Sequence, residues 1–221
     1  MLKRIFDIIF SSVVILILSP FLIPVIIILK FTGERYIFYS QKRMGIGGET
    51  FDLLKFATML KDSPNMAGGD ITSGNDPRVL PFGRILRKTK INELPQLFNI
   101  FKGDISVVGP RPLTPKNFNY YSDTAKEAIS QLRPGLTGIG SIVFRDEESI
   151  IANSAKSTVD CYREDISPYK GELEIWYKNN RSFMLDIELI FLTAWVIVFP
   201  ESRLYEKLFK GLPERPGALR N

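Results

Sequence analysis

A long apolar stretch dominates the start of the chain. Residues 8–29 read IIFSSVVILILSPFLIPVIIIL and carry no charge. These about 22 residues, at about 1.5 Å each, just cover a ~30 Å hydrocarbon layer. The stretch is too long for the apolar part of a signal peptide, and no small-residue cleavage site follows it. We therefore expect residues 1–35 to stay attached as a membrane anchor.

Two topologies are compatible with the length of this anchor, a helix that spans the membrane and one that re-enters the same face. Cations flank both ends: Lys3 and Arg4 before the stretch, Lys30 and Arg35 after it. Cations at both ends favour keeping both on the cytoplasmic side. Ser19 and Pro20 lie at the middle, and a proline there interrupts the helical hydrogen bonds. These features favour a re-entrant helix that is broken at Ser19 and Pro20.

Short strand-like runs and a polar segment follow the anchor. Residues 36–45 (YIFYSQKRMG) and 49–60 (ETFDLLKFATML) predict two strands. The polar residues 61–75, which include Gly68 and Gly69, predict a loop. A further short β-like run at residues 105–108 leads into the turn Gly109-Pro110-Arg111-Pro112.

Three other segments have helical spacing or length. Residues 79–90 predict an amphipathic helix with a strongly basic polar face, and residues 92–101 predict a second helix that stops at Gly103. Residues 189–199 are apolar on nearly all sides but too short to span a membrane, so they lie in the core or against lipid. The predicted class is α+β: a re-entrant membrane helix, then a small, mostly helical cytoplasmic domain with a minor β component at residues 36–200. Residues 201–221 form a basic tail.

Composition narrows the chemistry. The formal charge is +5, from 29 Lys and Arg against 24 Asp and Glu, which suits phosphates, anionic lipid or nucleic acid. The single cysteine, Cys161, allows no intrachain disulfide, and the absence of histidine excludes Ser-His-Asp and Cys-His mechanisms. A basic membrane-surface module that binds nucleic acid or anionic lipid is an alternative, but no RNA- or DNA-reading motif is recognisable. We therefore expect no nucleic-acid partner.

Nine short motifs follow one another along the chain. They are KRIFD (3–7), SP (19–20), QKRMG (41–45), KFATM (55–59), NELPQL (92–97), KGDIS (102–106), GPRP (109–112), RPGLTG (133–138) and residues 177–186. In this order, behind such an anchor, they resemble the monotopic phosphoglycosyl transferases, a bacterial sugar transferase family, over about residues 3–193.

The resemblance implies a reaction, a cofactor and a location. A sugar phosphate passes from a UDP-sugar to polyprenyl (undecaprenyl) phosphate with Mg²⁺, and UMP is released. This is the first membrane step of a bacterial glycan such as O-antigen, capsule or exopolysaccharide. The expected location is the cytoplasmic face of the inner membrane, in contact with membrane lipid. We also expect that the protein can form a homodimer.

Four cations are predicted to bind phosphate or nucleotide sugar. Prolines on both sides of Arg111 restrict the backbone, so its guanidinium can grip a phosphate at low entropic cost, unless it pairs with an acidic neighbour. Arg87 is a phosphate ligand or a solvated cation on a helix face. Lys55 neutralises the negative charge of the donor or of the carrier head group, or it only packs its aliphatic side chain against an apolar strand. Arg145, which an acidic tract follows, belongs to a substrate loop or merely to an exposed one.

The catalytic pair departs from the family pattern. There it is Asp-Glu, and the aspartate attacks the β-phosphate of the donor to form a covalent intermediate; here it is Asn92-Glu93. A carboxamide is a very poor nucleophile and a weak Mg²⁺ ligand. Asn92 and Glu93 nevertheless stay the candidate catalytic residues and the candidate metal ligands.

Three hypotheses explain the asparagine. In the first, the asparagine is a deliberate Asp-to-Asn change that traps substrate. In the second, polyprenyl phosphate attacks the nucleotide sugar directly with help from Glu93, so no nucleophilic aspartate is needed. In the third, the protein is an inactive scaffold that binds nucleotide sugar or lipid. We favour direct transfer, because the other phosphate-handling motifs are intact.

Overall fold

The computed structural model describes residues 1–66 and 76–219. The chain divides into two compact units, and each is described by itself. The first comprises Met1–Lys42 and Asp52–Asp104, and the second comprises Arg43–Phe51 and Ile105–Asn221. The part of the predicted polar loop at residues 67–75 lies outside the described residues.

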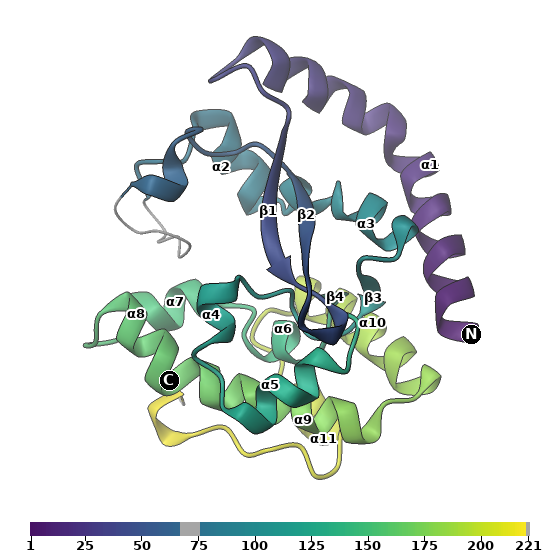
Figure 1. Cartoon of the computed structure of the whole chain (residues 1–221), viewed down its shortest axis with the longest axis vertical. Helices are drawn as coiled ribbons and strands as arrows, with labels where there is room; N and C mark the ends of the chain where they lie inside the picture. Colours follow the sequence, from purple (N-terminus) through teal and green to yellow (C-terminus); the bar gives the residue numbers. More distant parts are fainter. Residues whose placement is uncertain (67–75, 220–221) are drawn as a thin grey trace. The chain divides into compact units, whose positions relative to one another are not determined.

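The apolar anchor is a single helix, α1, Leu2–Phe31. In the described part of the chain it is the one helix long and apolar enough to cross a membrane. Pro20 and Pro24 lie inside it and remove two backbone donors, and the Ser19 hydroxyl donates to the Leu16 carbonyl at 2.9 Å. Figure 1 shows the axis of α1 changing direction along its length. The membrane-type helix is thus confirmed as an element, with the prolines at its middle.

The N-terminal end of α1 packs against α3, Gln96–Lys102. The Arg4 guanidinium donates from Nη1 to the Ile100 carbonyl and from Nη2 to the Phe101 carbonyl, both at 2.6 Å. The last carbonyls of a helix have no partner within the helix and carry its negative dipole end, so a guanidinium suits them. Arg4 therefore closes the C-terminus of α3 and fastens it to the membrane helix.

Replacing Arg4 with lysine should destabilise the protein by about 1.5–3 kcal/mol, because an ammonium keeps the charge but cannot reach both carbonyls in a fork. Lys3→Ala removes a cation from the same turn and should cost about 0.5 kcal/mol or less. Urea unfolding in detergent measures both. Equal losses in the two variants would mean that charge alone matters at this end of α1.

The two predicted strands are confirmed as a hairpin in which β1, Phe38–Met44, pairs with β2, Thr50–Phe56 (Figure 1). After β2 the chain stays extended, and the Thr58 carbonyl accepts from the Leu80 nitrogen at 2.9 Å. This pairing places α2, Pro81–Lys88, against the end of the hairpin strand. A Cβ atom on Gly83 would lie 2.1 Å from the Thr58 oxygen, so only glycine permits this approach.

The two predicted helices after the loop exist but are shorter. The helix predicted at 79–90 is α2, which begins at Pro81 because proline is favoured at the first helical position. The helix predicted at 92–101 is α3, and it starts only at Gln96, since Pro95 lacks the N–H that would continue the preceding turn. The predicted glycine stop is confirmed: Gly103 has φ 102° and ends α3.

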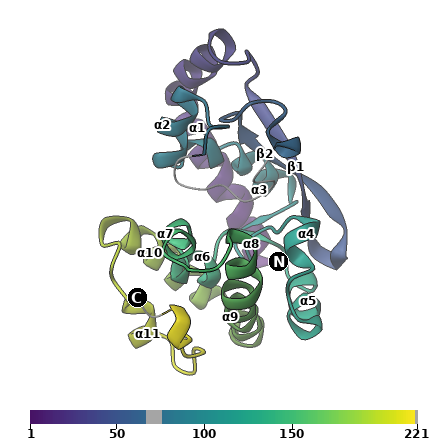
Figure 2. The same cartoon turned by 90° about the vertical axis from the view of Figure 1, so that its left-hand side faces the viewer.

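The second unit is mostly helical. Its two short strands, β3, Ser106–Val108, and β4, Gly135–Thr137, pair in parallel with Ser106 opposite Gly135. Its helices are α4 Pro115–Phe118, α5 Asp123–Ser130, α6 Ile139–Val143, α7 Glu147–Ala152, α8 Thr158–Cys161, the π-helical η4 Tyr162–Ile166, α9 Ser167–Asn180, α10 Phe183–Val198 and α11 Leu204–Leu208. α9 packs against α5 (Figure 2) and α6, and Leu173 at its centre is fully buried. The predicted mixture of many helices and few strands is confirmed.

The apolar segment predicted at 189–199 belongs to α10, which begins earlier, at Phe183. Leu189, Leu192 and Val196 are buried in the second unit, whereas Phe191 and Ile197 are exposed. One side of α10 therefore lies in the core and another is a free apolar surface. Within residues 201–219, α11 and the buried Phe209 pack on the second unit, with the Phe209 ring 5.3 Å from that of Trp176.

Candidate functional site

Lys55 and Glu93 are brought together in the first unit. The Lys55 ammonium on β2 lies 3.5 Å from the Glu93 carboxylate, and each side chain is 18% exposed. Glu93 ends the short 3₁₀ turn η3, Ile91–Glu93. Partial burial strengthens the electrostatic attraction between the two charges relative to a pair in water. Both side chains remain accessible enough to contact a polar ligand. The structure therefore joins two of the predicted site residues from segments 38 positions apart in the sequence.

Asn92 is the buried member of this turn. Its side chain is 6% exposed, and its Oδ1 has no hydrogen-bond partner among the described residues. A buried carbonyl oxygen without a partner is costly and calls for an explanation such as a ligand. Lys90, which precedes η3, has φ 59°, a left-handed conformation that is uncommon for residues other than glycine. Strain of this kind clusters at functional sites.

Arg87 lies in the last turn of α2, which packs against η3. Its Nη1 lies 3.8 Å from the sulfur of Met59, a weak contact, and its charge helps to lower the pKa of Asp76. The larger cause of that lowered pKa is the buried pair that Asp76 makes with Arg78 at 2.6 Å. Arg87 is thus a half-buried cation on the element next to Asn92 and Glu93.

Arg111 lies in the second unit, in a turn that backbone contacts hold on one side. The Gly109 nitrogen donates to the Thr137 carbonyl, and the Gly135 nitrogen donates to the Pro110 carbonyl, both at 2.8 Å. A Cβ atom on Gly135 would lie 2.1 Å from the Gly109 nitrogen. The RPGLTG and GPRP motifs therefore need their glycines so that two backbone segments can touch.

The other side of the GPRP turn, residues 109–112, is held by the end of the hairpin. The Arg43 guanidinium donates to the Pro112 carbonyl at 3.0 Å, and the Met44 nitrogen donates to the Leu113 carbonyl at 2.8 Å. The side chain of Arg111 is exposed. The turn thus has a backbone held on both sides, with Arg111 exposed on it.

Arg145 also belongs to the second unit, between α6 and α7. Its side chain is half-buried, and its Nη1 has no hydrogen-bond partner among the described residues. The structure therefore places Arg145 and Arg111 in one unit and Lys55, Arg87, Asn92 and Glu93 in the other.

Metal binding can be tested on the donor atoms. Among residues 1–66 and 76–219 no group of three or more His, Cys, Asp or Glu side chains is placed to hold a metal ion. The unpartnered Asn92 Oδ1 and the adjacent Glu93 carboxylate are oxygen donors. Mg²⁺ commonly takes one or two protein oxygens and completes its shell with waters and substrate phosphates. These two residues fit a Mg²⁺ ion that arrives mainly with its phosphates.

Sequence reasoning missed Glu174 and Lys170 of α9. Both are buried, and both line a small cavity together with Arg111. Burial raises the pKa of Glu174 to about 8. The signal was present: Tyr169, Leu173 and Tyr177 form an apolar stripe at helical spacing, and Lys170 and Glu174 sit beside it. A charged residue on a core stripe is a candidate for function.

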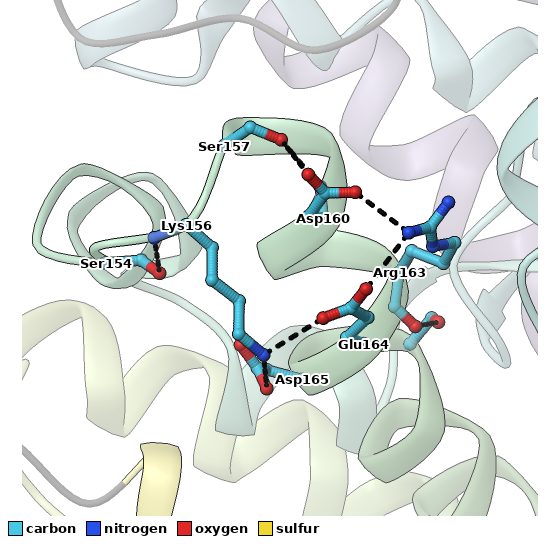
Figure 3. A network of polar contacts seen from close by, with 8 residues as sticks. Ser154, Lys156, Ser157, Asp160, Arg163, Glu164 and Asp165 are labelled. Carbon is cyan, nitrogen blue, oxygen red and sulfur yellow. Dashed lines mark hydrogen bonds and ion pairs between the residues drawn. The ribbon is translucent and has the colours of Figure 1, made fainter.

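A surface network braces the segment before α9. It joins Lys156 to Glu164 and Asp165, and Arg163 to Asp160 and Glu164 (Figure 3). These contacts lower the pKa of Glu164 and raise that of Lys156 through hydrogen bonding. On the inner side of η4 the Tyr162 ring is buried, with its centroid 5.6 Å from the Lys170 ammonium. The π-helical turn thus carries the ion pairs on its outer side and presents Tyr162 to Lys170, one of the residues that line the cavity.

Comparison with known proteins places the chain in a family. The model of the family described as bacterial sugar transferase matches residues 1–200. The exopolysaccharide production protein ExoY of Sinorhizobium fredii is 33% identical over 205 residues, which are 86% of this chain and 83% of that protein. The ExoY protein of Rhizobium meliloti is 36% identical over 172 residues, 72% of this chain and 76% of that protein.

A longer relative carries the name of an activity. The undecaprenyl-phosphate galactose phosphotransferase of Salmonella typhimurium is 32% identical over 211 residues, 89% of this chain but 40% of that protein. The family that the nine motifs predict is confirmed, and the names of the relatives support the expected class of enzyme, a phosphoglycosyl transferase. The chain belongs to the bacterial sugar transferase family.

Proposed function

We propose that the protein transfers a sugar phosphate from a UDP-sugar to polyprenyl phosphate and releases UMP, as the first membrane step of a bacterial glycan. The observation that carries the proposal is the rigid presentation of Arg111, in a chain that the family model matches over residues 1–200. Both substrates are polyanions, so a fixed guanidinium stabilises charge that spreads over the transferring phosphoryl oxygens.

The step is a direct displacement. An oxygen of the polyprenyl phosphate attacks the β-phosphorus of the UDP-sugar, and the bond from that phosphorus to the bridging oxygen breaks. UMP leaves with the bridging oxygen and its electron pair, and the product is a polyprenyl diphosphate sugar. The acceptor phosphate is already an anion, so no residue has to remove a proton from it. Asn92 is then not a nucleophile.

Each predicted residue has a part in this step. Arg111 binds a phosphate of the donor, and Lys55 offsets the charge around Glu93. Arg87 and Arg145 are further phosphate or sugar ligands. Glu93 and the Asn92 oxygen would hold Mg²⁺, which would neutralise phosphate charge and polarise phosphoryl oxygens.

The protein works at the cytoplasmic face of the inner membrane, with α1 re-entrant. The prolines inside α1, the cations at both of its ends and the exposed apolar side of α10 support this placement. Its partners are the UDP-sugar, polyprenyl phosphate and membrane lipid, and it acts alone or as a homodimer.

The re-entrant topology predicts how the middle of α1 reacts with a label. In a Cys161→Ser background, a cysteine at Ser19 should resist a membrane-impermeant maleimide applied from the periplasm, because the bend stays within the bilayer. Cysteines at Lys3 and Lys30 should both react only from the cytoplasmic side. Labelling of position 30 from the periplasm would show that α1 spans the membrane.

The reaction itself is tested by UMP release. Purified protein with Mg²⁺ and polyprenyl phosphate should release UMP from at least one member of a UDP-sugar panel, and none when the carrier is left out. The asparagine at position 92 favours a second candidate, an inactive scaffold that binds nucleotide sugar or lipid. Binding of a UDP-sugar without UMP release across the whole panel would support the scaffold and contradict the transferase.

A further inference from the structure

One edge of strand β2 faces α3 in the first unit. Just after β2, the Ala57 nitrogen donates to the Ile37 carbonyl at 2.8 Å, on the side of β1. Alternate residues of an antiparallel strand turn their N–H and C=O groups to opposite edges, so those of Asp52 and Leu54 point away from β1. Edge groups of this kind need partners when they are covered. Figure 1 and Figure 2 both show α3 beside β2.

A single side chain of α3 pairs with this edge. Asn99 Oδ1 accepts from the Leu54 nitrogen at 2.9 Å, and Asn99 Nδ2 donates to the Asp52 carbonyl at 2.8 Å. Nδ2 also donates to Asp104 Oδ2 at 2.9 Å. The Asn99 residue is 6% exposed. Its amide therefore pairs with β2 as the peptide group of a third strand would, and both of its N–H hydrogens have acceptors.

The backbone of Asn99 holds the end of α3 as well. Its carbonyl accepts from the Gly103 nitrogen at 2.9 Å and from the Asp104 nitrogen at 3.0 Å. Asp104 is thus bound to Asn99 through both main chain and side chain. Moving a buried amide with these contacts is costly, because any shift leaves a polar group without a partner. Asn99 therefore resists sliding of α3 along β2.

Both members of the Lys55–Glu93 pair are connected to this contact. Lys55 directly follows the strand residue whose nitrogen Asn99 accepts. Glu93 leads into α3 through a turn in which the Leu97 nitrogen donates to the Leu94 carbonyl at 3.0 Å. The ammonium and carboxylate of the pair are 3.5 Å apart and each side chain is 18% exposed. A partly accessible pair at this distance contributes too little to hold two elements in register.

We propose that Asn99 is a positioning residue: its amide sets the register of β2 against α3 and thereby places the Lys55 ammonium beside Glu93, in the turn that carries Asn92. The buried amide contacts are the stronger link between the two elements, so the ion pair follows the register and does not set it. The inference rests on the proposed function, in which Lys55 and Glu93 act at the donor phosphates.

Acetylation of Lys55 tests the proposal without any need for catalysis. Asn99→Asp keeps the shape of the side chain and the acceptor for the Leu54 nitrogen, but it removes both N–H donors. In this variant the rate at which N-hydroxysuccinimidyl acetate modifies Lys55 should rise about tenfold, because the side chain leaves the carboxylate and its partly buried position. Mass spectrometry of peptides from the folded protein measures the rate, with the exposed Lys116 as internal reference.

Ile100→Val is the matched structural control. Ile100 is the next residue of α3 and is fully buried, so the substitution loosens the same helix but leaves the Asn99 amide in place. The acetylation rate of Lys55 should stay within about twofold of the wild-type rate in this variant. An equal rise in Asn99→Asp and Ile100→Val overturns the inference, and so does the absence of any rise in Asn99→Asp.

Hydrogen exchange of the Leu54 amide tests the contact in the wild-type protein. Because Asn99 Oδ1 accepts from this nitrogen, the amide should exchange on the order of 10²-fold more slowly than in an unstructured peptide. Exchange at the unprotected rate overturns the inference, even if Asn99→Asp fails to fold.

A double-mutant cycle connects the contact to turnover. Asn99→Asp should lower kcat/KM for UMP release about tenfold in the wild-type background, since it displaces a group at the donor phosphates. In a Lys55→Met background the same change should cost less than about twofold, because the group that it displaces is already absent. Equal losses in the two backgrounds overturn the inference. Absence of UMP release from the wild type contradicts the proposed function instead, and acetylation and hydrogen exchange still decide the role of Asn99.

Discussion

Replacing Arg111 with alanine is expected to lower kcat/KM for the UDP-sugar by about 10²–10³-fold, because a preorganised charged donor to a transferring phosphate contributes about that much. The backbone of the GPRP turn is held by Gly135, Thr137 and Arg43, so the substitution removes the guanidinium without releasing the turn. Arg111→Lys should recover only part of the loss, since an ammonium cannot grip a phosphate with two parallel hydrogen bonds. Steady-state release of UMP gives both values.

Lys116 provides the matched control for Arg111. It is an exposed cation on α4 in the same unit, a few residues after the GPRP turn. Lys116→Ala should change kcat/KM by less than about twofold, as expected for a screened surface charge. If Arg111→Ala and Lys116→Ala gave equal and small effects, Arg111 would be a general surface cation and not a phosphate clamp.

Asn92→Asp is expected to create a covalent intermediate that the wild type does not form. The substitution restores the family's Asp-Glu pair at a position where the side chain is buried and its Oδ1 has no partner among the described residues. A carboxylate there can attack the β-phosphorus, whereas the carboxamide cannot. Incubation with a labelled UDP-sugar but no acceptor should raise the label on the protein from none to on the order of one phosphosugar per chain.

The same chemical change at an exposed position controls for non-specific labelling. Asn119 at the end of α4 is exposed, and Asn119→Asp should leave the protein unlabelled. A stable adduct on the wild-type protein would rule out direct transfer. Failure of Asn92→Asp to form an adduct, in a protein that still folds and binds UDP-sugar, would place Asn92 away from the reacting phosphorus.

Local sequence patterns predicted the elements whose causes lie close together in the chain. The apolar stretch of α1, the two strands of the hairpin and the stop at Gly103 all follow from residues within a few positions of one another. The start of α3 was misplaced by four residues even though its cause, Pro95, is visible in the sequence. Periodicity identified the helix, but the missing proline donor decided where it begins.

Contacts between distant residues decided what the sequence could not show. The prolines around Arg111 predict a restricted turn. They do not predict that Arg43, 69 positions before Pro112, donates a hydrogen bond to the Pro112 carbonyl. Lys90 takes a left-handed conformation, and Gly83 of α2 approaches the Thr58 carbonyl of a separate segment. A positive φ for lysine has no local signature.

Glu174 is an intermediate case. Its position beside the stripe of Tyr169, Leu173 and Tyr177 can be read from the sequence, and so can the conflict between a carboxyl group and a buried helix face. The cavity, the close approach of Gly140 and the pairing of Lys170 with Glu147 depend on the packing of α6, α7 and α9. The sequence therefore indicates that the residue is unusual, and the structure indicates what it faces.

The fate of the β-phosphate of the donor is the most direct measurement of the central claim. With UDP-sugar labelled at this phosphorus and polyprenyl phosphate present, we expect the label in an organic-extractable polyprenyl diphosphate sugar, in amounts equal to the UMP released, with none bound to the protein. Label that stays in water-soluble products or remains attached to the chain would contradict direct transfer to the lipid carrier.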